Sequence, residues 1–467
     1  MLTLKGGENT KMKKLDISFI ALQLILIGIF FVPFNSWEGI PFLGEYYRDS
    51  CFLFFTLAFL IILFKRKINL PYKNLIFQLL LFFILWALFA TLLNMFSISD
   101  YYFKQTSGIS RFINQFGSLI IAALLIPITF YNVFKGLSVN RVLLLIRKTI
   151  LISLIIVTAY AVVEILIVKF DFTGLKKSVL NLFDYFPFTE AKTDMRLKRI
   201  SSVTFEPPAL GTYLISIAGW MFSYVITEKK NYKYVPGLVV LVLGFFSGSR
   251  AAFFAILIQF VLAVIVIFKE TPVKKNIYKI GLISFFASVV ILFTYHRQIF
   301  KYVENEVASF KLSDPTHALS NKSRFGIQYA MYKVFLDNPV IGAGYGQQAF
   351  EARSKYPPWA KRNNWEFRLK YLNQNSKRFP PGYNLYLRLA AETGALGLLG
   401  FLLVILYIMI WCYNNLKMQK NLLAIIVFVS MAGFMLNWLK MDTFRIYGFW
   451  ICLALIFVAS NKKISNV

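Results

Sequence analysis

The sequence predicts an all-α polytopic membrane protein with about 12 transmembrane helices and a large external loop between helices 9 and 10. Hydrophobic residues make up 58% of the 467 residues, which is more apolar surface than a soluble globule of this length can bury. Apolar runs long enough to cross a bilayer, which takes roughly 20 residues, recur along the chain. Basic residues gather in every second connection between these runs, as multi-pass proteins require.

Twelve apolar runs are expected to form the spans. No small-residue cleavage site follows Phe34, so we expect the first run to remain as an uncleaved span. The chain then divides into spans 1 to 9 within residues 1–295, the external loop 296–384, and spans 10 to 12 within residues 385–467. The expected spans comprise residues 16–34, 50–64, 74–97, 115–134, 149–168, 208–227, 234–249, 251–268, 278–295, 385–413, 421–438 and 446–460.

The distribution of charge gives the expected orientation. If the N-terminus lies in the cytoplasm, clusters such as Lys65–Lys67 fall on the cytoplasmic side, whereas the two short external connections carry only Arg48, Lys104 and Arg111. By the positive-inside rule, both termini are therefore expected in the cytoplasm. Because topology accounts for most of the net charge of +29, this charge does not indicate a nucleic-acid partner.

The external loop 296–384 departs from this pattern, because it holds fourteen Lys and Arg residues against six acids. The external segment 170–206 is also basic. Such an excess of cations beside a membrane suits an anionic ligand such as a diphosphate; the alternative is a solvated basic surface. Within the loop, apolar residues at helical spacing predict a helix over residues 325–336 that ends before Pro339.

Two arginines are candidates for binding such an anion. Arg250 follows Ser247-Gly248-Ser249 in a short external turn between two apolar runs, where a charge is costly and tends to be functional. Arg324 begins the predicted loop helix, and its planar guanidinium suits diphosphate oxygens. The alternatives are an Arg250 that extends to lipid headgroups and an Arg324 that is simply solvated.

Glu206 is the candidate general base. It lies at the outer end of the sixth expected span, before Pro207 and after a basic patch that ends at Arg199. A carboxylate in this position can accept the proton of a sugar hydroxyl. The alternative is an acid near a helix N-terminus that complements the helix dipole. Arg199 is a candidate for substrate binding.

Further candidates surround the entry to the tenth span. Tyr383 and Asn384 lie where the loop meets the span, and Arg388 follows Asn384 by one helical turn on the same face. All three are candidates for contact with substrate. The alternative for Arg388 is an intramembrane ion pair with Glu392.

Two glycine-containing segments near that entry are further candidates. Gly344 and Tyr345 belong to a glycine-rich turn whose backbone can approach ligand phosphates, so both are predicted to bind substrate. Gly394 and Gly397 are expected to allow close packing of another helix against the tenth span.

The sequence indicates neither a metal site nor a cofactor. His296 and His317, the two histidines, have no cysteine or carboxylate at metal-ligand spacing. The three cysteines lie within apolar runs and are expected to be buried thiols. We therefore expect metal-free chemistry.

The segment from Phe379 to Gly397 resembles the C-terminal signature of the bacterial O-antigen ligase and O-antigen polymerase superfamily. It holds a Tyr383-Asn384 pair, nine further residues, and then Gly394-x-x-Gly397. In the ligases the first residue of the pair is usually histidine. A tyrosine with a pKa near 10 is a poor general base at neutral pH, so Tyr383 is expected to bind sugar or phosphate through its hydroxyl instead.

The resemblance covers roughly residues 200–460, and Glu206, Arg250 and Arg324 occur in the order of the superfamily's motifs. It implies a metal-independent glycosyltransferase of the GT-C type in the bacterial inner (plasma) membrane. The implied partners are undecaprenyl-diphosphate-linked oligosaccharides, as donor and acceptor, and membrane lipid, with a chain-length regulator as a further candidate.

The polymerase branch of the superfamily implies transfer of the growing glycan from undecaprenyl diphosphate to a sugar hydroxyl of a new lipid-linked repeat unit. Arg250 and Arg324 would stabilise the departing diphosphate, and Glu206 would accept the hydroxyl proton. One alternative is an O-antigen ligase that transfers to lipid A-core or protein. The other, from a different class, is a flippase or exporter, which would need charges along a path through the bilayer, whereas the expected spans are nearly free of charge.

Overall fold

The computed structural model describes residues 17–64, 68–270, 318–418 and 421–464. These parts of the chain are mostly helical, which confirms the expected all-α membrane class. The helices that coincide with expected spans are α1 (Ile17–Phe31), α2 (Ser50–Phe64), α3 (Leu75–Leu93), α5 (Gly108–Ile120) continued by the π-helical turn η2 (Ile121–Leu125) and α6 (Ile126–Phe134), α7 (Val139–Phe170), α9 (Pro207–Phe222), α11 (Val235–Phe246), α12 (Arg250–Glu270), α17 (Leu385–Met418), α18 (Leu422–Asn437) and α19 (Tyr447–Ile464).

Eleven of the twelve expected spans thus fall on helices. The remaining one, the ninth (278–295), lies outside the described residues. By length and composition, six helical segments of the described chain can cross a membrane. They comprise Leu75–Leu93, Gly108–Phe134, Val139–Phe170, Pro207–Thr227, Arg250–Ile267 and Leu385–Lys417. The count of twelve spans stays a prediction.

Polar side chains set several helix boundaries. The side chains of Asn74, Ser107 and Ser138 accept hydrogen bonds from backbone N–H groups in the first turns of α3, α5 and α7. Each cap satisfies a donor that the helix itself leaves unpaired. The cap at Ser107 begins α5 seven residues before the expected span 115–134, so Arg111 lies on a helix and not in a loop.

Short elements occupy the connections. They are η1 (Pro41–Tyr46), α4 (Met95–Asp100), β1 (Tyr102–Phe103), β2 (Thr106–Ser107), α8 (Gly174–Ser178), η3 (Leu180–Tyr185), α10 (Tyr224–Thr227), η4 (Asn231–Tyr234), α14 (Ala318–Asp337), α15 (Gln348–Ala352), α16 (Pro358–Lys361) and the π-helical turn η5 (Glu366–Tyr371). The antiparallel pair β1–β2 places Lys104 at its tip. The Lys104 ammonium is buried and donates to the carbonyls of Lys370, Asn373 and Ser376, which fixes the end of η5.

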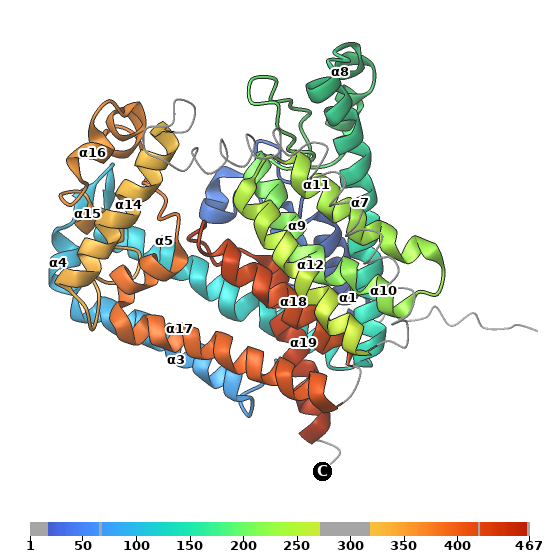
Figure 1. Cartoon of the computed structure of the whole chain (residues 1–467). Coiled ribbons are helices and arrows are strands. Elements are labelled where there is room, and N and C mark those ends of the chain that lie inside the picture. The colour runs from blue at the N-terminus through green and yellow to red at the C-terminus, as the bar shows by residue number, and fades with distance from the viewer. Residues whose placement is uncertain (1–16, 65–67, 271–317, 419–420, 465–467) are drawn as a thin grey trace, which may run out of the picture.

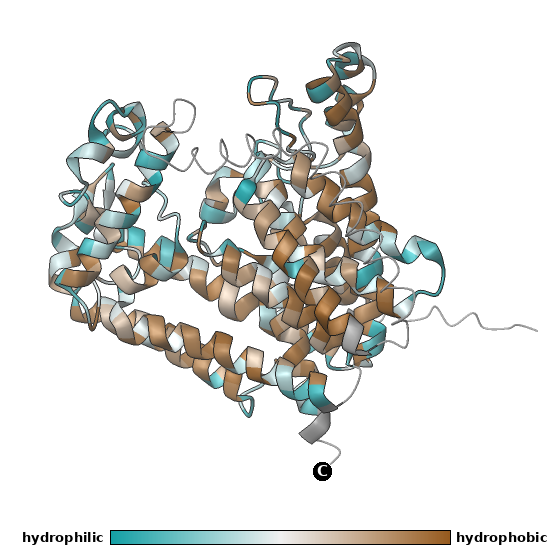
Figure 2. Cartoon of the chain, viewed as in Figure 1, coloured by the Kyte–Doolittle hydropathy of each residue, from teal (hydrophilic) through white to brown (hydrophobic). Residues whose placement is uncertain are grey.

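The helices form a bundle from which one pair extends. In the bundle, α9, α12 and α18 pack against one another, and α1 packs against α2 and α7. The long helices α3 and α17 lie side by side, and α14, α15 and α16 stand at one end of this pair (Figure 1). The bundle helices and the α3–α17 pair are largely apolar, whereas hydrophilic residues concentrate in the connections and around α14 to α16 (Figure 2).

The predicted helix of loop 296–384 is confirmed, since α14 contains residues 325–336 and ends at Asp337, before Pro339. Its inner face belongs to a small hydrophobic core, separate from the main one, that also includes Tyr356 and Phe367. The described part of the loop therefore packs as a unit of its own against the start of α17.

A break in α17 joins this unit to the membrane helices. Gly394 has a φ of +66° within the helix, so the carbonyls before it lose their helical partners. Instead, the N–H groups of Ala343 and Gly344 donate to the carbonyls of Ala391 and Glu392, both at 2.9 Å. The turn after α14 therefore packs against the break in α17 and replaces the missing helical hydrogen bonds.

The two glycines of α17 therefore have different neighbours. A Cβ on Gly397 would lie 2.9 Å from the Trp86 side chain of α3, which confirms close helix packing at this position. A Cβ on Gly394 would lie 2.1 Å from the backbone oxygen of Val340, so this glycine accommodates the turn after α14 and not another helix.

We expect Gly394→Ala to destabilise the protein by about 2–4 kcal/mol, because alanine is strained at positive φ and would collide with rigid backbone. The control is Gly117→Ala, since Gly117 lies in α5 with open space around it and alanine favours a helix. Thermal unfolding in detergent compares the two variants. Equal unfolding midpoints would contradict a structural role for the break.

Candidate functional site

A cavity of about 540 Å³ lies where several helix ends and connections meet. This volume is in the range of pockets that bind small molecules. The cavity collects residues from the N-termini of α9 and α12, from α14, from the segment before α17, and from the connections α1–α2 and α18–α19. All of these parts were expected on the external side, so the cavity is lined by segments from one side of the predicted topology.

Five of the nine predicted site residues line this cavity. They are Arg199, Glu206, Arg250, Arg324 and Tyr383. The other four predicted residues (Gly344, Tyr345, Asn384 and Arg388) are not part of its lining.

Arg199 lies against the tight turn between α11 and α12 that precedes Arg250. Gly248 has a φ of +62°, and a Cβ there would lie 2.7 Å from Cγ of Arg199, so the glycine makes room for that side chain. The Ser247 hydroxyl stabilises the turn by donating to the carbonyl of Gly244 at 2.7 Å. Since Arg250 is the first residue of α12, its charge adds to the positive end of the helix dipole.

Glu206 occupies the N-cap position of α9, but its side chain makes no capping hydrogen bond. The carboxylate contributes to the cavity lining instead. Burial raises the pKa of Glu206 above its usual value, and the nearby cations Arg324, Lys440 and Arg48 oppose this shift. A carboxylate with a raised pKa is a better proton acceptor than an ordinary one, provided that it is ionised.

The segment before Glu206 is held by hydrogen bonds to two side chains, of which those to Glu164 are buried. Glu164 of α7 accepts hydrogen bonds from the N–H groups of Ser201 and Ser202, the second at 2.7 Å. The side chain of Asn35 accepts from the N–H of Phe205 at 3.0 Å. The sequence showed Glu164 only as a charge within an apolar run; it holds in place the chain that carries Glu206.

Arg324 and Tyr383 lie against each other. The guanidinium carbon is 5.3 Å from the tyrosine ring centroid, and within the described chain Arg324 makes no hydrogen bond or ion pair. The Tyr383 hydroxyl lies 3.1 Å from that of Tyr371. Burial raises the pKa of Tyr383, so the hydroxyl stays protonated at neutral pH and suits hydrogen bonding better than proton abstraction.

The backbone of Tyr383 is strained. Its φ is +57°, a conformation that tyrosine rarely adopts and that costs of order 1–3 kcal/mol. Gln328 of α14 donates to the carbonyl of Tyr383 at 3.2 Å and helps to hold this conformation. Strain of this kind at a cavity wall is a common property of functional sites.

The connection between α18 and α19 contributes two cavity residues that sequence reasoning did not assign. Lys440 lines the cavity, and its buried Nζ has no hydrogen-bond partner within the described chain. Asp442 also lines it, and its carboxylate accepts from the N–H of Gly382 at 2.7 Å. A Lys-x-Asp pair in a short connection that was expected to be external was the signal that could have found them.

A third residue of this connection is fixed by ion pairs. Arg445 lies 3.3 Å from the carboxylate of Asp49 and 3.7 Å from that of Glu45. Tyr447 donates to the same Asp49 at 2.7 Å. These contacts tie the α18–α19 connection to the α1–α2 connection, so Arg445 is already neutralised by protein groups.

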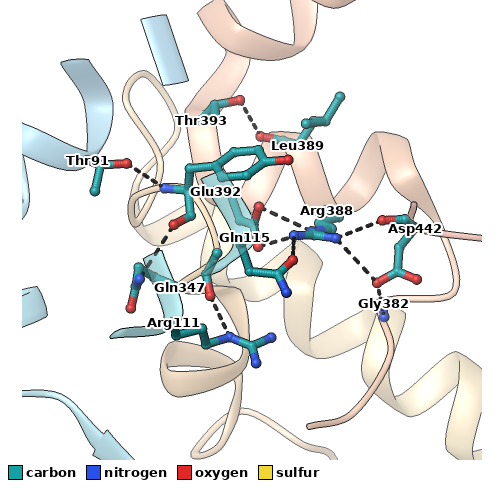
Figure 3. A network of polar contacts seen from close by, with 12 residues as sticks. Thr91, Arg111, Gln115, Gln347, Gly382, Arg388, Leu389, Glu392, Thr393 and Asp442 are labelled. Carbon is teal, nitrogen blue, oxygen red and sulfur yellow. Dashed lines mark hydrogen bonds and ion pairs between the residues drawn. The ribbon is translucent and has the colours of Figure 1, made fainter. Parts of the chain in front are cut away.

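Arg388 is the centre of a buried network beside the cavity (Figure 3). Its Nε lies 3.2 Å from both carboxylate oxygens of Glu392, which confirms the expected ion pair. One terminal nitrogen donates to the backbone carbonyl of Asp442 at 2.8 Å, and the other to Gln115 of α5 at 2.7 Å. This geometry supports a structural role, because the guanidinium has protein partners in all these directions.

The remaining predicted residues, Asn384, Gly344 and Tyr345, also make hydrogen bonds within the protein. The Asn384 side chain accepts from the N–H of Leu387 and so caps the first turn of α17. The expectation that the turn at Gly344 and Tyr345 offers its N–H groups to phosphate is not met. The first donates to α17, as described above, and the second donates to the Thr91 hydroxyl at 2.9 Å.

Among the described residues, no three His, Cys, Asp or Glu side chains form a group that could hold a metal ion. The three cysteines are free and buried, as expected. The cavity therefore offers guanidinium and ammonium groups around the carboxylate of Glu206, while the other two lining carboxylates, Asp49 and Asp442, are bound by protein groups. Such a set can bind a phosphorylated or otherwise anionic ligand and accept a proton.

Residues 235–402 match the family model described as O-antigen ligase. This match confirms the resemblance to the O-antigen ligase and polymerase superfamily. It includes Arg250, Arg324 and Tyr383, whereas Arg199 and Glu206 precede it. No curated protein matches the chain significantly.

We expect Arg388→Met to lower the stability of the protein by about 3–5 kcal/mol, because it leaves the fully buried Glu392 carboxylate without its cation. The double variant Arg388→Met/Glu392→Gln removes both charges and is expected to recover much of the loss. Thermal unfolding of both proteins measures the difference. A single variant as stable as the double variant would show that the ion pair does not hold this region together.

Proposed function

We propose that this chain is a polymerase of lipid-linked surface polysaccharide; the match of residues 235–402 to the O-antigen ligase family model supports this proposal. The donor is a growing glycan on undecaprenyl diphosphate, and the acceptor is a new repeat unit on the same lipid. The observation that carries the proposal is the convergence of Arg199, Arg250, Arg324 and Lys440 with the carboxylate of Glu206 in a single cavity.

The proposed reaction is a displacement at the anomeric carbon of the donor. An acceptor hydroxyl forms the new C–O bond while the bond to the diphosphate breaks, and the electron pair leaves with the diphosphate. Glu206 takes the hydroxyl proton, and Arg250 and Arg324 stabilise the charge that develops on the leaving group. Attack in line with the departing diphosphate inverts the anomeric configuration. The step needs neither a metal nor a cofactor.

The proposal includes a topology. Twelve spans of a GT-C-type enzyme cross the bacterial inner membrane, both termini are cytoplasmic, and loop 296–384 is external. Residues 1–295 then form nine spans, and 385–467 the last three. The cavity gathers connections that are external in this topology, where lipid-anchored diphosphates already lie at the membrane surface. Anchoring removes much of the entropic cost of bringing donor and acceptor together.

Polymerase activity is favoured over ligase activity by Tyr383, which replaces the usual ligase histidine. Its protonated hydroxyl, paired with that of Tyr371, suits the positioning of a sugar or phosphate. An exporter is less well supported, since the cations gather at the external helix ends. The buried charges of Glu164, Arg388 and Glu392 within the helices all have protein partners.

The activity is tested with purified protein in liposomes that contain lipid-linked repeat units, with and without EDTA. A ladder of longer lipid-linked chains supports the polymerase. Transfer only to added lipid A-core or protein identifies a ligase, and unchanged units on the opposite leaflet identify a flippase. A chain-length regulator, added as a second protein, should alter only the length distribution of a polymerase.

In this assay, Arg250→Ala and Arg324→Ala should each lower the initial rate by about 10²–10³-fold, because each removes a cation from the departing diphosphate. Lysine at either position should restore the rate only in part, since it lacks the bidentate guanidinium. Arg141→Ala, at an exposed arginine in the first turn of α7, is the matched control. A full rate from either cavity variant removes that arginine from the site.

Glu206→Gln should lower the rate by about 10²–10⁴-fold, whereas Tyr383→Phe should cost about tenfold, as for one lost hydrogen bond. The raised pKa of Glu206 sets the sign of the pH dependence: the rate of the wild type falls as the pH falls through this pKa, which lies above the usual value of about 4.3. Rates of both variants across pH are the measurement. An inactive Tyr383→Phe beside an active Glu206→Gln would assign the proton transfer to the tyrosine.

A further inference from the structure

Lys440 is a buried cation for which the fold provides no anion. Its Nζ is shielded from solvent and donates no hydrogen bond to any described residue. An ammonium group in such a place loses hydration without gaining a partner, and this costs free energy unless a ligand supplies the anion. The side chain nevertheless belongs to the cavity lining, so a ligand in the cavity can supply that partner.

The connection that carries Lys440 is fixed on both sides. On one side, the carbonyl of Trp438 accepts from the N–H of Leu385 at 2.9 Å. On the other side, Asp442 is held by Arg388 and Gly382, as described above. The backbone that carries Lys440 is thus held by contacts that do not involve its side chain, which is a property of preorganised binding groups.

The charged groups that face Lys440 are Arg324 of α14 and Glu206 at the start of α9. Arg324, which also lacks an ion-pair partner in the described chain, repels the ammonium, and Glu206 attracts it without forming an ion pair. Burial and the Arg324 charge lower the pKa of Lys440 to about 8. Two unpaired cations beside each other are stabilised together when one dianionic group binds between them.

We propose that Lys440 is a phosphate-binding residue, and that it holds one phosphoryl group of the lipid-linked diphosphate together with Arg324. The assignment rests on the proposed function for the identity of the ligand. It adds a cation from the α18–α19 connection, outside the segment 235–402, to those supplied by Arg199 and Arg250. The same contact places the phosphoryl group beside Glu206. The proposed reaction needs this proximity, because the diphosphate is its leaving group and Glu206 its proton acceptor.

Binding of inorganic pyrophosphate to the purified full-length protein tests this assignment, with glucuronate as a second probe for a sugar carboxylate. Lys440→Met should weaken pyrophosphate binding by about 10-fold or more, the usual effect of losing a charge-assisted hydrogen bond. The control Lys361→Met removes the same charge from an exposed lysine of α16 and should leave binding unchanged. Unfolding midpoints verify that both variants are folded.

The pH dependence gives a second measurement that needs no neutral variant. Because the ammonium is lost as the pH rises through about 8, wild-type affinity should fall up to about tenfold per pH unit above pH 8, relative to Lys440→Arg, whose guanidinium stays charged. Equal pyrophosphate affinities of Lys440→Met and Lys361→Met overturn the assignment. The assignment is also overturned if Lys440→Met weakens binding of glucuronate only, or if the wild-type protein does not bind pyrophosphate at millimolar concentration.

This experiment is independent of catalysis. A protein that makes no polymer but loses pyrophosphate affinity in Lys440→Met rejects the polymerase and retains Lys440 as a phosphate-binding residue. A protein that makes polymer and binds pyrophosphate equally well with Lys440→Met retains the polymerase and rejects Lys440.

Discussion

The geometry of the cavity depends on the buried guanidinium of Arg388. A cation removed from water is tolerated only if protein groups replace its hydration in all directions. Here the replacements come from three parts of the chain, which are Glu392 on α17, Gln115 on α5 and the backbone of Asp442 before α19. Because all three contact the same planar group, early and late helices are fixed relative to one another. The requirement to solvate one charge therefore determines the relative positions of helices that are distant in sequence.

This network lies beside the cavity and not in it, but its members extend into the lining. Asp442 lines the cavity and also accepts from the N–H of Gly382, next to the strained Tyr383. Lys440 lies two residues before Asp442 in the same connection. The side chains that face the cavity are thus held by contacts behind them. Groups that are fixed before substrate arrives need not reorganise while charge develops, and this is the largest source of electrostatic stabilisation in such sites.

The anion-binding capacity of the cavity resides in side chains. The glycine-rich turn after α14 had the composition of a phosphate loop, but the break at Gly394 leaves carbonyls of α17 unpaired, and the turn's N–H groups satisfy them. A backbone donor can serve a helix end or a ligand, and buried carbonyls must be satisfied whether or not a ligand is bound. The cavity lining itself supplies cationic side chains, among them Arg250, Arg324 and Lys440.

The sequence by itself determined the helices and many of the residues around the cavity. Apolar runs and caps such as Asn74 and Ser138 act within a few residues, so their effect can be read locally. Arg250 and Arg324 could be singled out for the same reason, since a cation in an apolar turn or at the start of a loop helix is visible in its own segment.

Tertiary structure alone decided which charges are used by the fold and which face the cavity. Arg388 and Lys440 are both cations near helix ends, and the local sequence offers an anion at i+4, Glu392, only to Arg388. Arg388 has Glu392, Gln115 and Asp442 around it, whereas the Lys440 ammonium has no hydrogen-bond partner among the described residues. Glu392 could be read from the sequence, but other partners of a buried charge, such as Gln115, come from segments hundreds of residues away, and only the packing of the helices brings those segments into contact.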